Sequence, residues 1–344
     1  MSARTILSIL KSRPAAAAFG LVALALTTQA QVHAERIAPN PGSANSVWMV
    51  KNAGAPINTE YHDGWATITG DGLTLYFSSN RPGGVAPANA EDGWYMGKDG
   101  TPTRYSVYVS HRATRSSPWG DPKLLPRGVN SGYADHSALQ SDDGHWLFFA
   151  SDRPGGCGGL DLYASYRRNI RDDMAWEQPV NLGCENDGGP NSSGIDSCPN
   201  YDGKANIYFT SAKDANPVNL DFKVTRFDRL TRKAGAARIL PNSIPDMDGH
   251  IDPKHRYVWA IYPDGVGGSD IWQFEAGANA RDPSQWKKPI KPLPSLINTK
   301  YEDQMPAVTG DGEILTFVSD RPGGKGGLDI YEVVRAREDR RTAK

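Results

Sequence analysis

The stretch SDRPGGCGGLDLY occupies Ser151–Tyr163, and the stretch SDRPGGKGGLDIY occupies Ser319–Tyr331. Two nearly identical phrases so far apart indicate an internal repeat, because a repeated architecture needs the same turn several times. Their Gly and Pro residues predict a loop between two strands rather than a segment of the core. The residues around each phrase therefore define the repeating unit.

Alignment on this phrase gives five copies of one unit. Each copy begins with an Asp and a short strand, which a tight turn joins to a second strand such as LTLYFSS. The RPGG loop leads to a third strand such as DLYASYRR, and a weak fourth strand carries Trp and Pro, which edge strands tolerate. The recurring Trp48, Trp119, Trp176 and Trp286 are expected to pack between units.

Four-stranded units in tandem predict an all-β fold, a five-bladed β-propeller of four-stranded antiparallel blades. The fifth copy ends after its third strand. The N-terminal segment SVWMVKN is expected to supply the missing strand and to close the ring. The propeller is predicted over residues 47–336, followed by a charged tail at 337–344.

The N-terminus has the pattern of a targeting segment. A positively charged start, the apolar run AAAAFGLVALAL and the small-residue sequence VHA predict a signal peptide over residues 1–34, with Ala30 as a second cleavage site. Residues 35–46 would then form an N-terminal extension. We expect a periplasmic or secreted protein without a membrane span, since no later segment has about 20 consecutive apolar residues.

Composition narrows the choice of partner. The chain has 36 Gly and 25 Pro among 344 residues, as expected for many short strands and turns, and its formal net charge is −1. Without a basic stripe to neutralise phosphates, no nucleic-acid partner is expected. A protein or carbohydrate ligand and a monomeric state are expected instead.

The units resemble the PD40 or WD40-like propeller repeats of the periplasmic translocation protein TolB and its relatives. The resemblance rests on DG, LYF, RPGG and GG followed by D[IL]Y, most complete at Asp143–Tyr163 and Asp311–Tyr331. It implies a propeller over nearly all of the mature chain. Such propellers act as binding platforms, scaffolds or enzyme domains, so the resemblance alone leaves the function open.

An Asp at the entry to the first strand of each unit is the main candidate for chemistry. These residues are Asp63, Asp135, Asp196, Asp248 and Asp303. A ring of carboxylates at the channel mouth would raise some pKa values, and carboxylate pairs of unequal pKa perform glycoside hydrolysis. The alternative, which the repetition favours, is that each Asp caps a turn in its own blade.

The charged residues of the repeated phrase have two interpretations. Arg153 is expected to reach Asp161 across its loop, and Arg321 to reach Asp329, so that each pair pins a Gly-rich hairpin. Binding of Ca²⁺ by the loop is the alternative, although no complete calcium-loop spacing is present. No other cofactor or metal is expected.

Departures from the repeat predict the ligand-binding residues. Insertions in the first and third units project on the same face as the Asp ring, and long loops on one face of a rigid scaffold often carry function. The candidate ligand-binding residues are Trp65, Trp94, Tyr95, His136, His250 and Gln304. The two His residues would serve as metal ligands or as an acid and base, or else as structural residues.

Three cysteines permit one disulfide in an oxidising compartment. Cys184 and Cys198 enclose a short Gly- and Asn-rich loop and are the preferred pair, while pairing of Cys157 with either one stays open. The leading hypothesis is an exported propeller that binds a protein, peptide or glycan. The alternatives are a carbohydrate-active hydrolase that uses two of the Asp residues and a structural partner in an envelope complex.

Overall fold

The structure is a computed structural model. It describes residues 47–85, 95–96, 102–212, 220–240, 249–252, 257–263, 269–275, 291–292 and 296–336. The expected signal peptide, N-terminal extension and charged tail lie outside these residues. The described residues all belong to the unit His33–Lys344.

The described chain is all-β and is built from antiparallel sheets. The first contains β2 (Asp63–Ile68), β3 (Thr74–Ser79), β6 (Ser106–His111) and β7 (Lys123–Leu124), and the second contains β8 (Asp135–Gln140), β9 (Trp146–Ser151), β10 (Asp161–Tyr166) and β11 (Val180–Asn181). The third contains β12 (Ile195–Tyr201), β13 (Asn206–Ala212), β14 (Asp221–Asp228), β15 (Lys233–Ala234) and β16 (Arg238–Ile239). The fourth contains β17 (Gly249–Asp252), β18 (Tyr257–Pro263), β19 (Ser269–Glu275) and β20 (Lys291–Pro292), and the last contains β21 (Asp303–Val308), β22 (Ile314–Ser319), β23 (Asp329–Ala336) and β1 (Val47–Asn52). A two-stranded ribbon, β4 (Tyr95–Met96) with β5 (Pro102–Thr103), and a 3-10 turn at Glu185–Asp187 complete the described elements.

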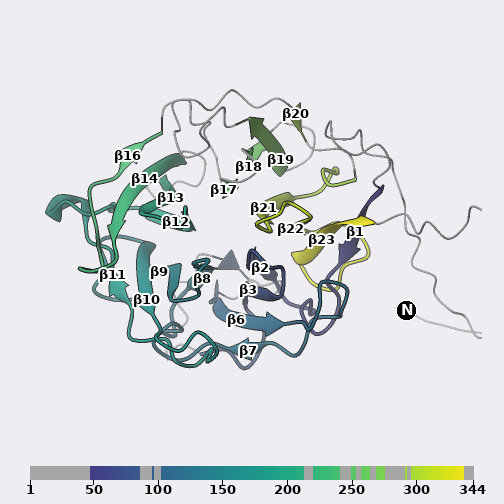
Figure 1. Cartoon of the computed structure of the whole chain (residues 1–344), viewed down its shortest axis with the longest axis horizontal. Helices are drawn as coiled ribbons and strands as arrows, with labels where there is room; N and C mark the ends of the chain where they lie inside the picture. Colours follow the sequence, from purple (N-terminus) through teal and green to yellow (C-terminus); the bar gives the residue numbers. More distant parts are fainter. Residues whose placement is uncertain are drawn as a thin grey trace, which may run out of the picture. The chain divides into compact units, whose positions relative to one another are not determined.

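The first strand of each sheet lies at the centre of a β-propeller (Figure 1). The inner strands contact one another in chain order, β2 with β8, β8 with β12, β12 with β17 and β17 with β21. β21 in turn contacts β2, so the contacts among inner strands return to their start. The sheets and the ring of inner strands confirm the sequence prediction of a propeller with four-stranded antiparallel blades.

The last sheet joins the two ends of the propeller. β1 pairs antiparallel with β23 from Val47 opposite Ala336 to Asn52 opposite Tyr331. The backbone N–H of Ala53 continues this pairing by donating to the carbonyl of Ile330. The N-terminal segment thus supplies the fourth strand that the fifth repeat lacks, as the sequence predicts.

The core lies between neighbouring sheets. Tyr76 and Val107 of the first sheet pack with Phe149 and Tyr163 of the second in one apolar cluster. Every residue of β9, WLFFAS, is buried, whereas the repeat predicts alternating apolar and polar residues. The reason is that each sheet has a neighbour on both faces.

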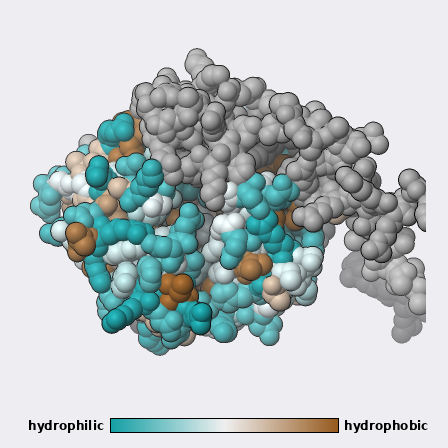
Figure 2. Space-filling model, in the orientation of Figure 1, coloured by the Kyte–Doolittle hydropathy of each residue, from teal (hydrophilic) through white to brown (hydrophobic). Residues whose placement is uncertain are grey.

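On the face in Figure 2 the described surface is mainly hydrophilic, with hydrophobic residues scattered singly.

The repeated turn and Trp residues have the predicted roles. The Gly of each Asp-Gly turn has a φ of +74° or +75°, which Gly adopts without steric cost; these are Gly72, Gly144, Gly203 and Gly312. Trp119 and Trp176 are buried, and the guanidinium groups of Arg112 and Arg167 lie 4.1 and 4.2 Å from their ring centroids. Trp286 and the side chain of Trp48 lie outside the described part.

A repeated Asn extends the pairing along the third strand of the preceding sheet. The side chain of Asn130 accepts from the backbone N–H of Val107 and donates to the carbonyls of Val107 and Leu125. Asn58, Asn191 and Asn298 pair in the same way with the third strand of the preceding sheet. An amide side chain here completes the pairing that a longer edge strand would otherwise provide.

Candidate functional site

The Asp at the start of each inner strand is held by groups of its own blade. Asp135 is fully buried, and its Oδ2 accepts from the backbone N–H of Ser131 (2.6 Å) and from the Ser131 hydroxyl (2.9 Å). Its Oδ1 accepts from Ser151 Oγ (2.6 Å) and from Arg153 Nη2 (2.7 Å). Burial raises the pKa of the Asp135 carboxyl, while Arg153 acts in the opposite direction.

The Arg of the repeated phrase clamps this Asp instead of the one in its own loop. Arg153 also donates to the carbonyls of Gly128 (3.0 Å) and Val129 (2.6 Å), and its guanidinium lies 4.8 Å from the ring centroid of Tyr163. The predicted pairing of Arg153 with Asp161 is therefore wrong. The clamp joins the start of strand β8 to the loop after strand β9, so one Arg fixes both loops at this end of the sheet.

The same clamp recurs in two other blades. Arg81 donates to Asp63 (2.6 Å), and Arg321 donates to Asp303, so the predicted pairing of Arg321 with Asp329 is also wrong. Thr59 and Thr299 take the place of Ser131. A buried carboxylate that accepts three or more hydrogen bonds from fixed groups acts as a structural anchor.

The Asp residues inside the repeated phrase bind their own loop. Asp161 accepts from the backbone N–H of Cys157 and from Asn181 Nδ2 (3.0 Å), and Asp329 accepts from the backbone N–H of Lys325. Burial raises the pKa of both carboxyls. These contacts pin the Gly-rich hairpins, although with backbone donors in place of the expected guanidinium.

Asp196 differs from the other described inner-strand Asp residues, because the third repeat has lost the RPGG phrase. Its Oδ2 accepts from the N–H (2.6 Å) and hydroxyl (2.9 Å) of Ser192. Ser211 lies directly opposite Asp196 in the sheet, at the place that Ser79 and Ser151 take opposite Asp63 and Asp135. Burial raises the pKa of Asp196, while the hydroxyl of Ser211, the N–H and hydroxyl of Ser192 and, least of all, Lys223 act in the opposite direction.

Two residues beyond the Asp, the inner strands carry a bulge with strained backbone. The register of β2, β8, β12 and β21 shifts there against the second strand of each sheet. The φ angles are +44° at Trp65, +57° at Ser137, +52° at Cys198 and +54° at Met305. Residues with a side chain rarely adopt this conformation, which costs about 1–3 kcal/mol each and clusters at functional sites.

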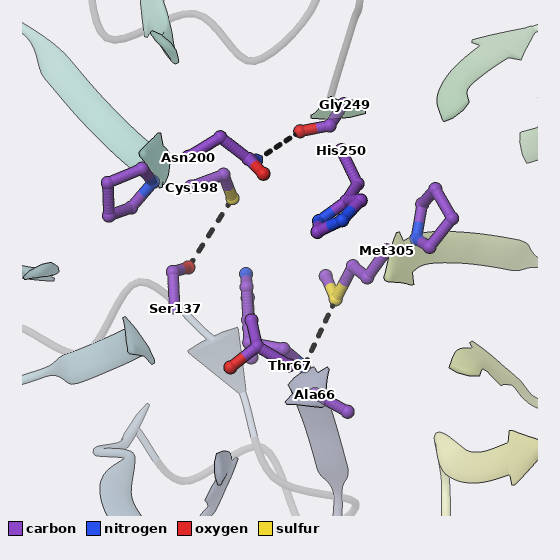
Figure 3. Close-up of a pocket in the computed structure, with 11 residues that line it drawn as sticks. Ala66, Thr67, Ser137, Cys198, Asn200, Gly249, His250 and Met305 are labelled. Atoms are coloured by element: carbon purple, nitrogen blue, oxygen red, sulfur yellow. Dashed lines mark hydrogen bonds between the residues drawn. The ribbon is translucent and has the colours of Figure 1, made fainter. Parts of the chain in front are cut away.

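These bulges surround one pocket in the centre of the propeller. Trp65, Ser137, Cys198 and Met305 line it together with His250 of β17 (Figure 3). The cavity has a volume of about 30 Å³, which is room for a water-sized group. The other lining residues are Ala66, Thr67, Pro199, Asn200, Gly249 and Pro306, so no carboxylate lines the described pocket.

A hydrogen-bonded chain runs along one wall of the pocket. His136 Nδ1 lies 2.7 Å from Ser137 Oγ, which lies 3.3 Å from Cys198 Sγ. Burial lowers the pKa of His136 to about 3, so this imidazole is neutral at physiological pH. Its ring packs against Trp65 with centroids 4.7 Å apart. The neutral ring holds Ser137, and through it the Cys198 thiol, in a fixed orientation.

The predicted ligand-binding residues divide into two groups. Trp65 and His250 line the pocket, and buried His136 packs behind it. Gln304 is half-buried, pairs with Val318 in β22 and does not line the pocket. Tyr95 lies in the ribbon β4–β5, and its side chain, like Trp94 and Asp248, lies outside the described part.

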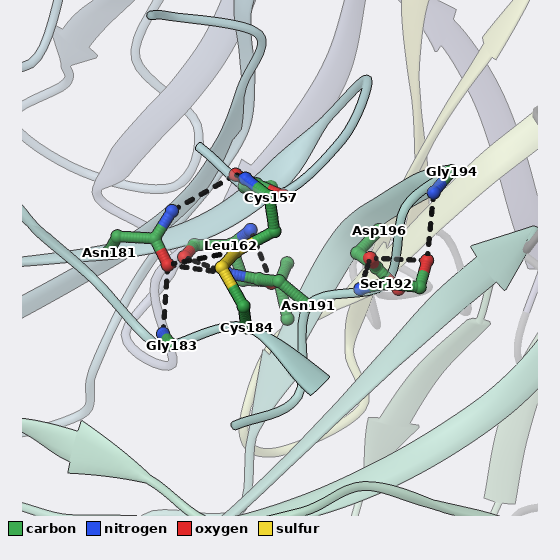
Figure 4. Close-up of a disulfide and its surroundings, with 10 residues drawn as sticks. Cys157, Leu162, Asn181, Gly183, Cys184, Asn191, Ser192, Gly194 and Asp196 are labelled. Carbon is green, nitrogen blue, oxygen red and sulfur yellow. Dashed lines mark hydrogen bonds between the residues drawn. A yellow bond between two sulfur atoms is a disulfide. The ribbon is translucent and has the colours of Figure 1, made fainter. Parts of the chain in front are cut away.

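The disulfide joins a different pair from the expected one. Cys157 and Cys184 are bonded, with Cα atoms 5.4 Å apart, and Cys198 remains outside the bond (Figure 4). The prediction of Cys184 with Cys198 is therefore wrong. Closeness in sequence does not decide the pairing here. The bulge of β12 places Cys198 in the central pocket, whereas the insertion places Cys184 beside the loop that carries Cys157.

Ser137, Cys198 and Met305 are pocket residues that were not recognised from the sequence as one set. Their spacing in the sequence could have identified them. Each pocket residue of this set stands two residues after the Asp of its unit: Trp65, Ser137, Cys198, His250 and Met305. Among the residues predicted from the sequence, Trp65 and His250 stand two positions after the Asp, whereas His136 and Gln304 stand one position after it. The position two residues after the Asp therefore holds a different side chain in each of the five units.

Comparisons with known proteins extend to the fold alone. No family model and no curated protein matches the chain. Among solved structures it is similar to a thermostable family-43 glycoside hydrolase (TM-score 0.50, 12% identity, 83% of this chain and 93% of that chain). It is also similar to TolB from Acinetobacter baumannii (TM-score 0.46, 12% identity, 84% of this chain) and to a putative TolB from Agrobacterium tumefaciens (TM-score 0.46, 14% identity, 85% of this chain and 92% of that chain). The chain spans 59% of the Acinetobacter protein.

A separate finding concerns membranes. In the described part of the chain, no helix is long and apolar enough to cross one.

Proposed function

We propose that this protein is an exported, five-bladed propeller of the PD40 type that acts as a binding module. Its ligand is a protein, peptide or glycan, taken at the central pocket and at the face that carries the clamped loops. The observation that supports this best is the contrast between repeated, internally bonded Asp residues and a pocket lined by five different side chains. Residues 47–336 form the binding domain, and the protein is a monomer.

The chemistry of the pocket suits binding. Ligand sites combine apolar and aromatic walls with a few placed polar groups. Here Trp65, Met305 and Pro306 supply the apolar wall, while Asn200 and His250 supply an amide and an imidazole. Strained bulges hold Trp65 and Met305 on strands, and strands position a site more rigidly than loops do.

A hydrolase is the less favoured alternative. Paired carboxylates act in glycoside hydrolysis when one can donate a proton to the substrate and the other can face the reacting carbon or a water. Asp63, Asp135 and Asp303 instead accept hydrogen bonds from Ser or Thr and from Arg of their own blades. Such contacts leave little room for proton exchange with a sugar.

The test is a ligand screen with the full mature chain. Wild-type protein and His250→Ala are compared on a glycan array and a peptide library, with Thr114→Ala as the control in an exposed turn at the opposite end of the blade. We expect at least one ligand whose binding falls in His250→Ala and stays unchanged in Thr114→Ala. Sugar release from aryl glycosides or polysaccharides that is lost in folded Asp303→Asn would overturn the proposal in favour of the hydrolase.

A further inference from the structure

The central pocket brings together three side chains with soft or borderline donor atoms. Cys198, His250 and Met305 stand at the same position of the consecutive inner strands β12, β17 and β21, and these strands contact one another in that order. Figure 3 shows the Cys198 sulfur, the His250 ring and the Met305 sulfur around the same opening. We propose that these three residues bind a soft monovalent metal ion, Cu(I).

The donor set selects the kind of metal. Thiolate and thioether sulfur favour Cu(I), whereas Ca²⁺ and Mg²⁺ need oxygen ligands. No carboxylate lines the described pocket, and no three His, Cys, Asp or Glu side chains cluster for a metal anywhere in the described chain. A four-coordinate Zn²⁺ site is therefore not provided. The third donor is the Met305 thioether, which Cu(I) accepts.

Both sulfur atoms are oriented by neighbouring groups. The backbone N–H of Trp65 donates to Met305 Sδ at 3.3 Å, and Ser137 Oγ lies 3.3 Å from Cys198 Sγ. Met is otherwise a flexible side chain, so this contact reduces the entropy that a ligand would have to remove. Outer contacts that fix the direction of metal ligands typically change metal affinity 10- to 100-fold.

The backbone explains how the donors reach the pocket. Cys198 and Met305 adopt positive φ at the bulge, as Trp65 and Ser137 do at the same position of their strands. The bulge therefore directs side chains of any chemistry into the pocket, and the metal assignment depends on which donor atoms stand there.

Binding exchanges a proton for the metal. As the sulfur–copper bond forms, the Cys198 thiol loses its proton to solvent, and no electron is transferred. Affinity should therefore rise with pH, because the proton and the metal compete for one sulfur. His250 binds as the neutral imidazole, and Met305 carries no proton, so one proton is released per ion at a pH where the imidazole is uncharged.

The inference uses the same pocket as the proposed binding function, and its test measures the metal directly. The mature protein is titrated anaerobically with Cu(I) against a chromophoric Cu(I) chelator, and with Ag(I) as an air-stable probe. We expect one equivalent bound by wild type and at least a 100-fold weaker affinity in Cys198→Ser. In Met305→Leu we expect about 10-fold weaker affinity, with no change in Met174→Leu, whose side chain is 45% exposed outside the pocket.

The outcomes separate the two proposals. Unchanged affinity in both Cys198→Ser and Met305→Leu, or wild-type protein that leaves all metal with the chelator, would overturn the metal site. Zn²⁺ bound more tightly than Ag(I) would also overturn the Cu(I) assignment. Thermal melts of each variant show whether it is folded, and the conservative Met305→Leu keeps the test decisive if Cys198→Ser unfolds. The glycan and peptide screen, run in metal-free buffer, tests the binding function independently.

Discussion

Two positions on each inner strand, only two residues apart, have opposite properties. In the four blades whose Asp is described, the first position holds a buried Asp, and in three of them this Asp is bonded to an Arg of the same blade. The second holds Trp65, Ser137, Cys198, His250 or Met305, which line the central pocket. The first position repeats in sequence and, in three blades, in its Arg contact, while the second differs in every blade.

The comparison shows that one position of each inner strand stabilises the blade, whereas the position two residues later lines the pocket. An Asp that must anchor two loops in every blade meets the same demand each time, so it is repeated. A residue that faces the shared central pocket meets side chains from the other blades, so a different side chain can stand there in each blade. In β2, β8, β12 and β21 the bulge falls at the second position, and the bulged residue itself is directed toward the pocket.

Breaking the clamp should have the largest effect. Arg153→Ala leaves the buried Asp135 carboxylate without its guanidinium and frees two carbonyls, so we expect a loss of about 3–5 kcal/mol in the free energy of unfolding. Urea unfolding measures it. Arg232→Ala is the control, since that Arg pairs with Glu177 on the surface and should cost less than about 1 kcal/mol. Equal losses would show that the clamp has no special role.

The blade without an Arg offers a matched test with a pH dependence. Asp135→Asn should destabilise by about 2–3 kcal/mol because it removes the partner of Arg153. Asp196→Asn should be neutral or stabilising at pH 7, because burial disfavours the charged carboxylate that it replaces. The pKa of Asp196 is raised in the folded state, so wild type loses stability as pH rises above the unfolded pKa of about 4. The stability of Asp196→Asn relative to wild type should therefore increase between pH 4 and 7 in urea titrations. A difference that shrinks over this range contradicts the assignment.

Changing a pocket residue should cost little stability. Met305→Leu conserves volume and loses only the weak contact from the Trp65 N–H, so we expect less than about 1.5 kcal/mol by thermal unfolding. Phe317→Leu, at a fully buried position between sheets, serves as the comparison and should cost more. If Met305→Leu proved as damaging as Arg153→Ala, the pocket position would be structural as well.

The smallest effect should come from the bulge itself. Ser137→Gly relieves a φ of +57° but loses the contacts with His136 and Cys198, so its stability should stay within about 1 kcal/mol of wild type. Ser137→Ala loses the same contacts and keeps the strain. Gly should therefore be the more stable variant by about 1 kcal/mol. Chemical unfolding of both proteins gives the sign, and a more stable Ala variant would contradict the strain.

Much of the fold follows from local signals in the sequence. The turn at Asp143-Gly144 needs a residue that tolerates positive φ, and the repeated spacing of such turns predicts sheets of equal size. The pairing of β1 with β23 was also predictable, because the fifth repeat lacks a strand that the N-terminal segment resembles. These features depend on residues close in sequence or on comparison of one repeat with another.

The candidate site was less predictable, because it depends on which distant residues meet. Arg153 could be assigned to either of two Asp residues from the sequence, and the structure places it against Asp135. The disulfide joins Cys157 to Cys184 for the same reason, since the loops of neighbouring sheets lie side by side. Spacing along the chain contains no information on such distances.

Short-range backbone preferences and repetition are enough to predict the strands, the turns, the closing strand and the Asp at the start of each unit. Which Arg holds each Asp, and that Cys198, His250 and Met305 share one pocket, depend on the folded arrangement. The bulges of β2, β8, β12 and β21 each direct one side chain into the pocket, and His250 lines it from β17 without a register shift. These side chains meet because the sheets surround a common axis, which spacing along the chain does not specify.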